Sequence, residues 1–316
     1  MRIDELSSQP VGTTAYGLAG LYIRSELPLP GVPPWPGDIP GRDKIVIRRA
    51  DVPRSLSVVT AVFPDGQCNK NELLLDIKGV SRYLVRDEEI LVDQAAGSTS
   101  GEVCAFLLGT AFGVLCHQRG ILPLHASSVD FTDGCIAFVG KSGAGKSTLV
   151  AALAARGHQV ISDDVCFLQR DEHGQIRVWP GLNRLRLWED AMKALGCDGP
   201  DVEREFRGYN KYLVPLCSPR NPGEPRRLRR IYQLEPAPDG DRASVNRLQG
   251  AAAVEVLIQN IYRSGLAEHM GRKPALFVTC AAAARDIPVF RFSRPLGFHA
   301  LREAVDVLED HLSDLQ

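Results

Sequence analysis

Residues 140–148 read Gly-Lys-Ser-Gly-Ala-Gly-Lys-Ser-Thr, and this stretch decides the fold class. It matches the pattern G-x-x-x-x-G-K-[ST], in which successive backbone N–H groups and a lysine surround an anion. The apolar run 135–139 before it predicts a buried strand, and the apolar residues of 149–154 recur at helical spacing. A glycine-rich loop between a strand and a helix predicts an α/β domain that binds phosphate at the helix N-terminus.

The residue types in the loop predict how a nucleotide would be held. The Lys146 side chain is long enough to reach the β- and γ-phosphates, and the Ser147 hydroxyl is suited to ligate Mg²⁺. We therefore expect a nucleoside triphosphate and Mg²⁺ as cofactors. The residues expected to contact the nucleotide are Gly140, Lys141, Ser142, Gly143, Ala144, Gly145, Lys146, Ser147 and Thr148.

The composition is that of an ordinary globular protein. Hydrophobic residues make up 44% and charged residues 24% of the 316 positions, and the formal net charge is -1. A nucleic-acid or acidic-membrane binder usually has a basic excess, so neither partner is expected. The longest apolar run, 103–116, is too short to span a bilayer. With no recognisable signal peptide and eight cysteines that form no C-x-x-C pair, we expect a cytoplasmic protein with reduced thiols.

Two regions of different pattern predict two domains. Residues 1–100 hold short runs rich in Val, Ile, Leu and Tyr that turn signals separate, which predicts a small β-rich N-terminal domain. Residues 27–41 contain six prolines and are expected to form a loop. A helical pattern over 101–119 begins the second domain, which is predicted to comprise residues 101–316 and to contain the phosphate-binding loop.

Polar residues at the ends of two neighbouring strands are candidates for catalysis. His125 lies in a predicted strand, 122–131, directly before the loop strand, where a histidine is more often part of the core. Asp163 and Asp164 close the strand that follows the loop helix. An acidic residue in that place commonly completes the Mg²⁺ site, and the second carboxylate is free to take a proton. The alternative is an ordinary acidic turn.

The chain resembles the HPr kinase/phosphorylase family, whose catalytic domain resembles phosphoenolpyruvate carboxykinase. The residues that carry the resemblance are His125, the loop 140–148, Arg156-Gly157-His158 and Asp163-Asp164. The resemblance covers about residues 122–168. The spacing from Lys146 forward to the second Asp and back to the His is similar to that of the family, and this joint spacing is more specific than any single motif.

The resemblance implies ATP and Mg²⁺ as cofactors and a role for each matching residue. His125 would assist catalysis near the γ-phosphate, and Lys146 would bind phosphate. Ser147 and Asp163 would hold Mg²⁺, and Asp164 would accept the proton of a substrate hydroxyl. Arg247 faintly resembles part of the family's arginine loop and is a further candidate for nucleotide binding.

Other residues are similar to a divergent branch of HPr-kinase-like proteins. Thr148 stands where the bifunctional enzymes carry Glu, and the chain has no E-I-R-G segment. Tyr16-Gly17-Leu18 and the Ser-Glu-Leu-Pro-Leu-Pro of 25–30 resemble that branch, some members of which phosphorylate the C-terminal serine of lasso peptides. The resemblance thus implies a kinase acting on a serine of a peptide or small protein, and it is compatible with a homo-oligomer.

Two other functions stay open at this point, namely a kinase for a small-molecule hydroxyl and an ATP- or GTP-dependent switch without phosphoryl transfer. His125 and the aspartate pair favour transfer. The basic run 226–230 is either a solvated charged face or a site for a carboxylate or phosphate of the acceptor. In the second case Arg226, Arg227, Arg229 and Arg230 would lie close to the γ-phosphate.

Overall fold

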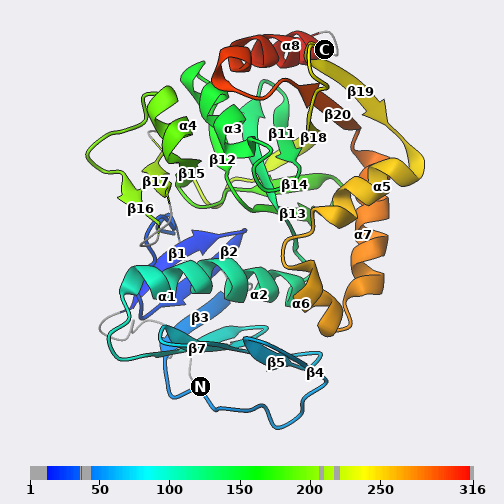
Figure 1. Ribbon diagram of the computed structural model, residues 1–316. Helices are drawn as coiled ribbons and strands as arrows, with labels where there is room; N and C mark the ends of the chain where they lie inside the picture. The colour runs from blue at the N-terminus through cyan, green and yellow to red at the C-terminus, as the bar shows by residue number, and fades with distance from the viewer. Residues whose placement is uncertain (1–12, 36, 38–43, 206–209, 217–220, 314–316) are drawn as a thin grey trace.

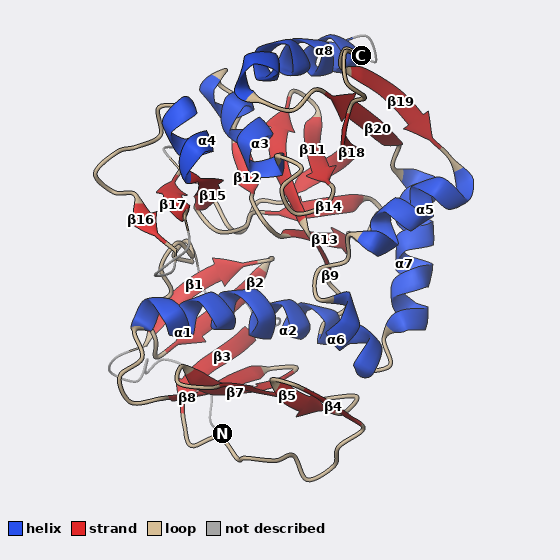
Figure 2. Ribbon diagram, viewed as in Figure 1, coloured by secondary structure: helices blue, strands red, loops and turns tan. Residues whose placement is uncertain are grey.

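The computed structural model describes residues 13–35, 37, 44–205, 210–216 and 221–313. Two layered halves lie one above the other in Figure 1. The lower half is a sheet with a long helix across it, and the upper half is a second sheet with helices on both faces. The fold is therefore mixed α/β with several sheets, as predicted, and strands and helices alternate most regularly in the upper half (Figure 2).

The N-terminal sheet has eight strands in the order β1-β2-β3-β8-β7-β6-β5-β4. Its strands are β1 (Thr14–Leu18), β2 (Leu21–Ser25), β3 (Lys44–Arg49), β4 (Ala61–Phe63), β5 (Gly66–Cys68), β6 (Leu73–Ile77), β7 (Ser81–Arg86) and β8 (Glu89–Gln94). The helix across it has three parts, α1 (Ser100–Phe106), the π-helical turn η1 (Leu107–Ala111) and α2 (Phe112–Gln118). A capping box between Thr99 and Glu102 begins this helix.

The long helix belongs to the core of the N-terminal sheet. Val103, Leu107 and Phe112 are fully buried in the same cluster as the inward residues of β2, β3, β7 and β8. The Tyr83 hydroxyl on β7 also donates a 2.8 Å hydrogen bond to the Val103 carbonyl. The predicted boundary at residue 100 separates this helix from the sheet, whereas its packing places it with the N-terminal half. By length and composition the helix could cross a membrane, but 67% of its most apolar window is buried inside the molecule.

The upper sheet is organised around the long strand β18 (Arg226–Pro236). The end of β18 pairs in parallel with β11 and β20, and its beginning pairs with β14. The other strands of this sheet are β9 (Leu122–Leu124), β10 (Ala126–Phe131), β11 (Gly134–Val139), β12 (Val160–Ser162), β13 (Cys166–Arg170), β14 (Ile176–Trp179), β19 (Ser244–Leu248) and β20 (Val289–Arg294).

Helices cover both faces of this sheet, which explains why its strands are apolar on both sides. One face packs on α3 (Lys146–Ala155) and α8 (Leu301–Ser313), and the other on α5 (Gly250–Gln259) and α7 (Lys273–Asp286). The remaining helical segments are α4 (Glu189–Ala194), α6 (Ser264–His269) and the 3₁₀ turn η2 (Phe298–Ala300).

A small third sheet includes part of 198–225, where the density of glycine, proline and charged residues predicts a long loop. Its order is β15-β17-β16, with bounds β15 (Arg184–Trp188), β16 (Glu203–Arg204) and β17 (Lys211–Pro215). The pattern was missed because β16 has only two residues, both exposed, and β17 buries a single side chain. Cys217 lies outside the described residues, and six of the other seven cysteines are buried.

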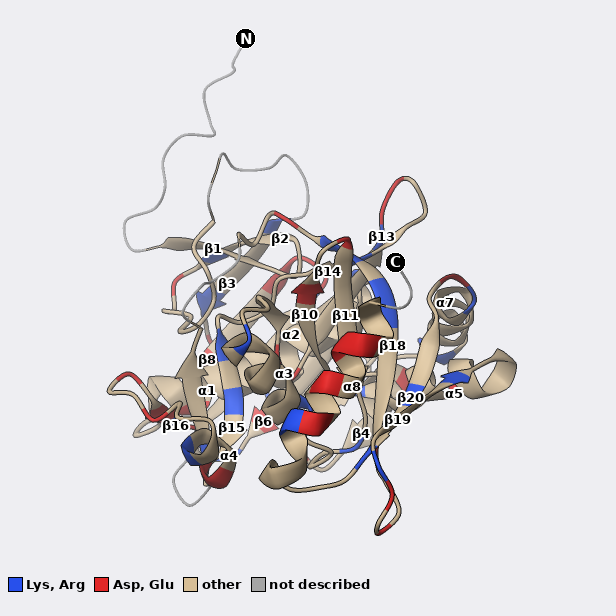
Figure 3. Cartoon of the chain, turned by 90° about the horizontal axis from the view of Figure 1, so that it is seen from above, with Lys and Arg blue, Asp and Glu red and all other residues tan. Residues whose placement is uncertain are grey.

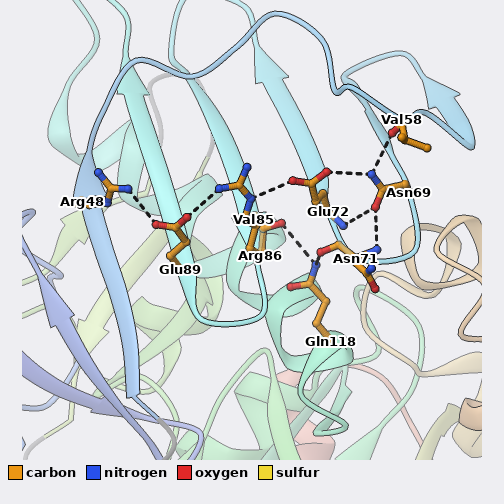
Figure 4. Close-up of polar contacts among 9 residues, drawn as sticks. All are labelled: Arg48, Val58, Asn69, Asn71, Glu72, Val85, Arg86, Glu89 and Gln118. Atoms are coloured by element: carbon orange, nitrogen blue, oxygen red, sulfur yellow. Dashed lines mark hydrogen bonds and ion pairs between the residues drawn. The ribbon is translucent and has the colours of Figure 1, made fainter.

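Charged side chains on the surface largely neutralise one another. Figure 4 shows a ladder across β3, β8, β7 and β6 in which Glu89 bonds Arg48 and Arg86, and Arg86 also bonds Glu72. Seen from above, α8 carries mainly acidic residues (Figure 3). Exposed ion pairs such as those of the ladder contribute about 0–1 kcal/mol each to stability.

The two halves meet at Gly20, in the turn between β1 and β2. Its φ is +76°, and a Cβ there would lie 2.5–2.8 Å from the ring of Trp179 on β14. Gly79 has nearly the same φ, +77°, with nothing within 4 Å of a Cβ. Both alanine variants should lose about 1 kcal/mol for the left-handed backbone. Gly20→Ala should lose about a further 1–3 kcal/mol because Trp179 must move.

Urea unfolding of Gly20→Ala and Gly79→Ala measures this difference. Equal midpoints for the two variants would contradict the contact between the halves.

Candidate active site

The loop 140–145, which the sequence predicts to bind phosphate, connects β11 to α3 in the predicted strand–loop–helix arrangement. Gly145 is the N-cap of α3, at φ +83°, and a Cβ at this position would lie 2.2 Å from the Arg294 guanidinium. Only glycine fits such a backbone beside such a neighbour. Because glycine has no side chain to cap the helix, the first N–H groups of α3 stay available to an anion.

The Lys146 ammonium is buried behind this loop and bonded entirely within the protein. Its Nζ donates to the Gly140 carbonyl at 2.8 Å and to the Lys141 carbonyl at 3.3 Å, and it lies 3.0 Å from His125 Nε2. The residue is 6% exposed. Burial lowers the pKa of Lys146 to about 8, although the nearby carboxylates of Asp164 and Asp163 favour the charged form.

His125 lies at the break between β9 and β10, where the sequence predicted one continuous strand. Its backbone N–H donates to the Asn260 carbonyl at 2.8 Å, so His125 takes no part in the strand pairing of β9 or of β10. The ring Nδ1 lies 3.0 Å from the Asp164 carbonyl oxygen, which can only accept. Nδ1 therefore carries the hydrogen, and Nε2 is the acceptor that faces Lys146. Burial, and then the charge of Lys146, lower the pKa of His125, which favours this neutral form.

Asp164 has a backbone that its neighbours hold in an uncommon conformation. Its φ is +70°, which costs an L-residue about 1–2 kcal/mol, and this turn aims its carbonyl at His125. The carboxylate is ion-paired with Arg186, whose second nitrogen lies 2.5 Å from Glu205. Burial raises the pKa of Asp164, but the positive charges of Arg186 and Lys211 outweigh burial and hold it below its usual value. Asp164 is therefore a carboxylate at neutral pH.

Asp163 is fixed by neutral donors rather than by an ion pair. The Ser127 hydroxyl donates to Oδ1 at 2.5 Å, and the backbone N–H of Arg186 donates to Oδ2 at 2.7 Å. Each oxygen keeps a lone pair for a further partner. Among the described residues no group of three His, Cys, Asp or Glu side chains could enclose a metal ion. The residues therefore fit Mg²⁺ that arrives with a nucleotide, since Mg²⁺ takes one or two protein ligands beside phosphate oxygens and water.

Three residues that sequence reasoning left without a role position the site. Asn260, at the end of α5, accepts from the Gly140 N–H at 2.9 Å through Oδ1 and from His125 through its carbonyl. Arg294, at the end of β20, is 4% exposed and donates to the Ala144 carbonyl at 2.9 Å. Arg186 lies on β15. Each is distant in sequence from the residue it holds, so no local spacing could have identified it.

The alternative that places the basic run 226–230 close to the γ-phosphate is wrong. Leu228 pairs with Cys135, so the beginning of β18 lies at the end of the sheet opposite the loop, about 16 Å from Gly140 at the strand rise of ~3.3 Å. There Arg226 pairs with Asp130 and Arg229 with Asp133. Because β18 runs parallel to β11, only the carboxyl end of β18 lies beside the loop, and the basic run is at its amino end.

Arg247 stays a prediction. It is exposed on β19, and β20 and β18 lie between it and the loop strand β11. At about 4.8 Å per strand the two backbones are about 14 Å apart. The structure does not bring Arg247 to the phosphate loop.

The pKa of Lys146 predicts that nucleotide binding takes up protons near pH 8. Triphosphate oxygens that replace the two backbone carbonyls favour the ammonium, so a lysine that is half deprotonated at pH 8 becomes protonated. Uptake should be about 0.1 proton per nucleotide at pH 7 and about 0.5 at pH 8. Calorimetry with Mg²⁺ and a non-hydrolysable ATP analogue, in two buffers of different ionisation enthalpy, measures it. Phosphate groups titrate near pH 6 and are ionised at pH 8. Uptake that fails to rise from pH 7 to pH 8 would argue against a buried, half-deprotonated Lys146.

Comparison with known proteins gives limited information. No family model matches the chain, and no curated protein matches it. Among solved structures the chain is similar to the HPr(Ser) kinase/phosphatase from Coxiella burnetii, with a TM-score of 0.31 and 15% sequence identity. That alignment covers 61% of this chain and 97% of the other.

Proposed function

We propose that the protein is a Mg-ATP-dependent kinase that phosphorylates a serine hydroxyl of a peptide or small protein. The observation that carries the proposal is the chain of contacts Lys146–His125–Asp164. Through one neutral histidine it joins the lysine of a phosphate-binding loop to the backbone carbonyl of Asp164, whose carboxylate Oδ1 lies 3.8 Å from His125 Nδ1. A protein that only binds nucleotide needs the lysine but not a buried carboxylate held beside it.

The binding step uses groups that the structure already orients. The loop amides and the N-terminus of α3 would receive the phosphates, and Lys146 would exchange its backbone carbonyls for β- and γ-phosphate oxygens. Ser147 and Asp163 would hold Mg²⁺, which supplies charge neutralisation at the transferred phosphoryl group. His125 would keep the lysine aimed at the γ-phosphate through Nε2.

The transfer step forms a bond between the serine oxygen and the γ-phosphorus, and it breaks the bond from that phosphorus to ADP. Asp164 takes the serine proton. In a loose transition state the serine proton is transferred late, so the base needs to be ionised more than it needs to be strong. A carboxylate with a lowered pKa, which is ionised at neutral pH, suits this role. Most of the rate enhancement would come from positioning and from neutralised charge.

The acceptor is the finer part of the proposal. A peptide serine, such as the C-terminal serine of a lasso-type precursor, would have to reach the γ-phosphate beside Asp164. The site geometry is compatible with any hydroxyl there, so a small-molecule alcohol is the competing acceptor. A screen of serine peptides against sugars and nucleosides with labelled ATP separates the two.

Asp164→Asn tests the mechanism. Asparagine keeps the shape but cannot accept the proton, so phosphoryl transfer should fall by about 10²-fold or more. The loop and Lys146 are unchanged, and the affinity for Mg-ATP should stay within a few-fold. Lys146→Ala is the matched variant, since it should lose nucleotide affinity and transfer together. An active Asp164→Asn protein beside an inactive Asp163→Asn protein would show that the two carboxylates have the opposite roles.

A further inference from the structure

A cavity of about 210 Å³ lies beside Asp164, between the two halves of the molecule. Leu18 of β1 and Phe106 and Leu108 of the long helix line it from the N-terminal half. Asp164 and Tyr262 line it from the other half. The N-terminal half therefore forms one wall of the space that opens onto the proposed base.

The wall formed by β15 carries two arginines in different situations. Arg186 is neutralised by Asp164 and Glu205. Arg184 also lines the cavity, but within the described part of the chain no carboxylate lies within ion-pair distance of it. Its NH1 makes one long bond, 3.4 Å, to the Pro30 carbonyl, and its Nε is buried without a hydrogen-bond partner.

The position of Arg184 is fixed by packing rather than by charge. Its stem passes over Gly31, where a Cβ would lie 3.2 Å from the Arg184 Cδ. Burial, and then the neighbouring charge of Arg186, lower the pKa of Arg184, although the more distant carboxylates of Glu205 and Asp164 favour its charged form. An unpaired guanidinium at this depth is unfavourable, and an oxyanion that forms two parallel N–H···O bonds with it would relieve that cost.

We propose that this cavity binds an oxyanionic group of the acceptor, a carboxylate or a phosphate, and that Arg184 is the residue that recognises it. The inference rests on the proposed kinase activity, because it places this group next to the hydroxyl that Asp164 deprotonates. The acceptor class is then a hydroxyl with an anionic group one or two residues away, such as a serine at the carboxyl end of a peptide.

The size and lining of the cavity agree with this class. At about 210 Å³ it is smaller than the ~300–1,000 Å³ sites that enclose drug-sized ligands, so it admits the end of a chain and not a folded surface. Leu18, Phe106 and Leu182 make part of the lining apolar, which strengthens the attraction between the guanidinium and an anion, while Asp163, Glu205 and Arg263 also line the cavity. Arg186 cannot take this role without giving up Asp164 or Glu205.

The test compares three labelled peptides in the presence of Mg²⁺ and a non-hydrolysable ATP analogue. One ends in serine with a free carboxylate, one is its amide, and one is an amide with phosphoserine beside the acceptor serine. The wild-type protein should bind at least one anionic peptide about 10- to 100-fold more tightly than the neutral amide. In Arg184→Gln this advantage should disappear, and Arg184→Lys should retain part of it, because lysine keeps the charge without the fork. Which anionic peptide binds identifies the group.

Arg229→Gln is the matched control, because Arg229 pairs with Asp133 at the far end of the sheet, and it should keep the full preference. Thermal unfolding of each variant checks that it is folded. Equal binding of all three peptides to the wild-type protein, or an unchanged preference in folded Arg184→Gln, would overturn the inference. A clear preference without any phosphate transfer from ATP would instead refute the proposed kinase function and leave the anion site standing.

Discussion

The structure of the site depends on keeping one ammonium group out of water. Lys146 is held by two loop carbonyls and one histidine ring nitrogen, and these partners come from two places in the chain. Asn260 then holds both Gly140 and His125. The loop conformation, the break between β9 and β10 and the end of α5 are thus parts of one arrangement. A triphosphate would replace carbonyl dipoles with full negative charges at a site that is already formed.

The second constraint is the left-handed backbone of Asp164. The unfavourable conformation is maintained because three contacts need it at once, namely the carbonyl to His125, the carboxylate to Arg186, and the adjacent Asp163 to Ser127. Strain that many neighbours hold in place is typical of sites where a side chain must be aimed. Arg186 and Glu205 complete this charge cluster, and the cavity with Arg184 lies directly beside it.

The local part of the site could be read from the sequence, and the long-range part could not. Strand 134–139, the loop and helix 146–155 follow from apolar periodicity and from three glycines, because their interactions are between near neighbours. The run 226–230 was misplaced because spacing along the chain does not give strand direction. The helix 100–118 was separated from its sheet because an apolar helix does not state which sheet it covers. Nothing in the sequence distinguishes Arg184 from Arg186 two residues later, since the absence of a carboxylate partner is a property of the folded chain.

The central claim is that Lys146, His125 and Asp164 form a phosphoryl-transfer site around the loop 140–148. A crystal structure with Mg²⁺ and a non-hydrolysable ATP analogue tests it most directly. The account predicts that Lys146 Nζ leaves the Gly140 carbonyl, now 2.8 Å away, and contacts the β- and γ-phosphates, with the Asp164 carboxylate facing the γ-phosphate. A nucleotide bound elsewhere, or Lys146 still bonded to Gly140 with the nucleotide in place, would contradict it.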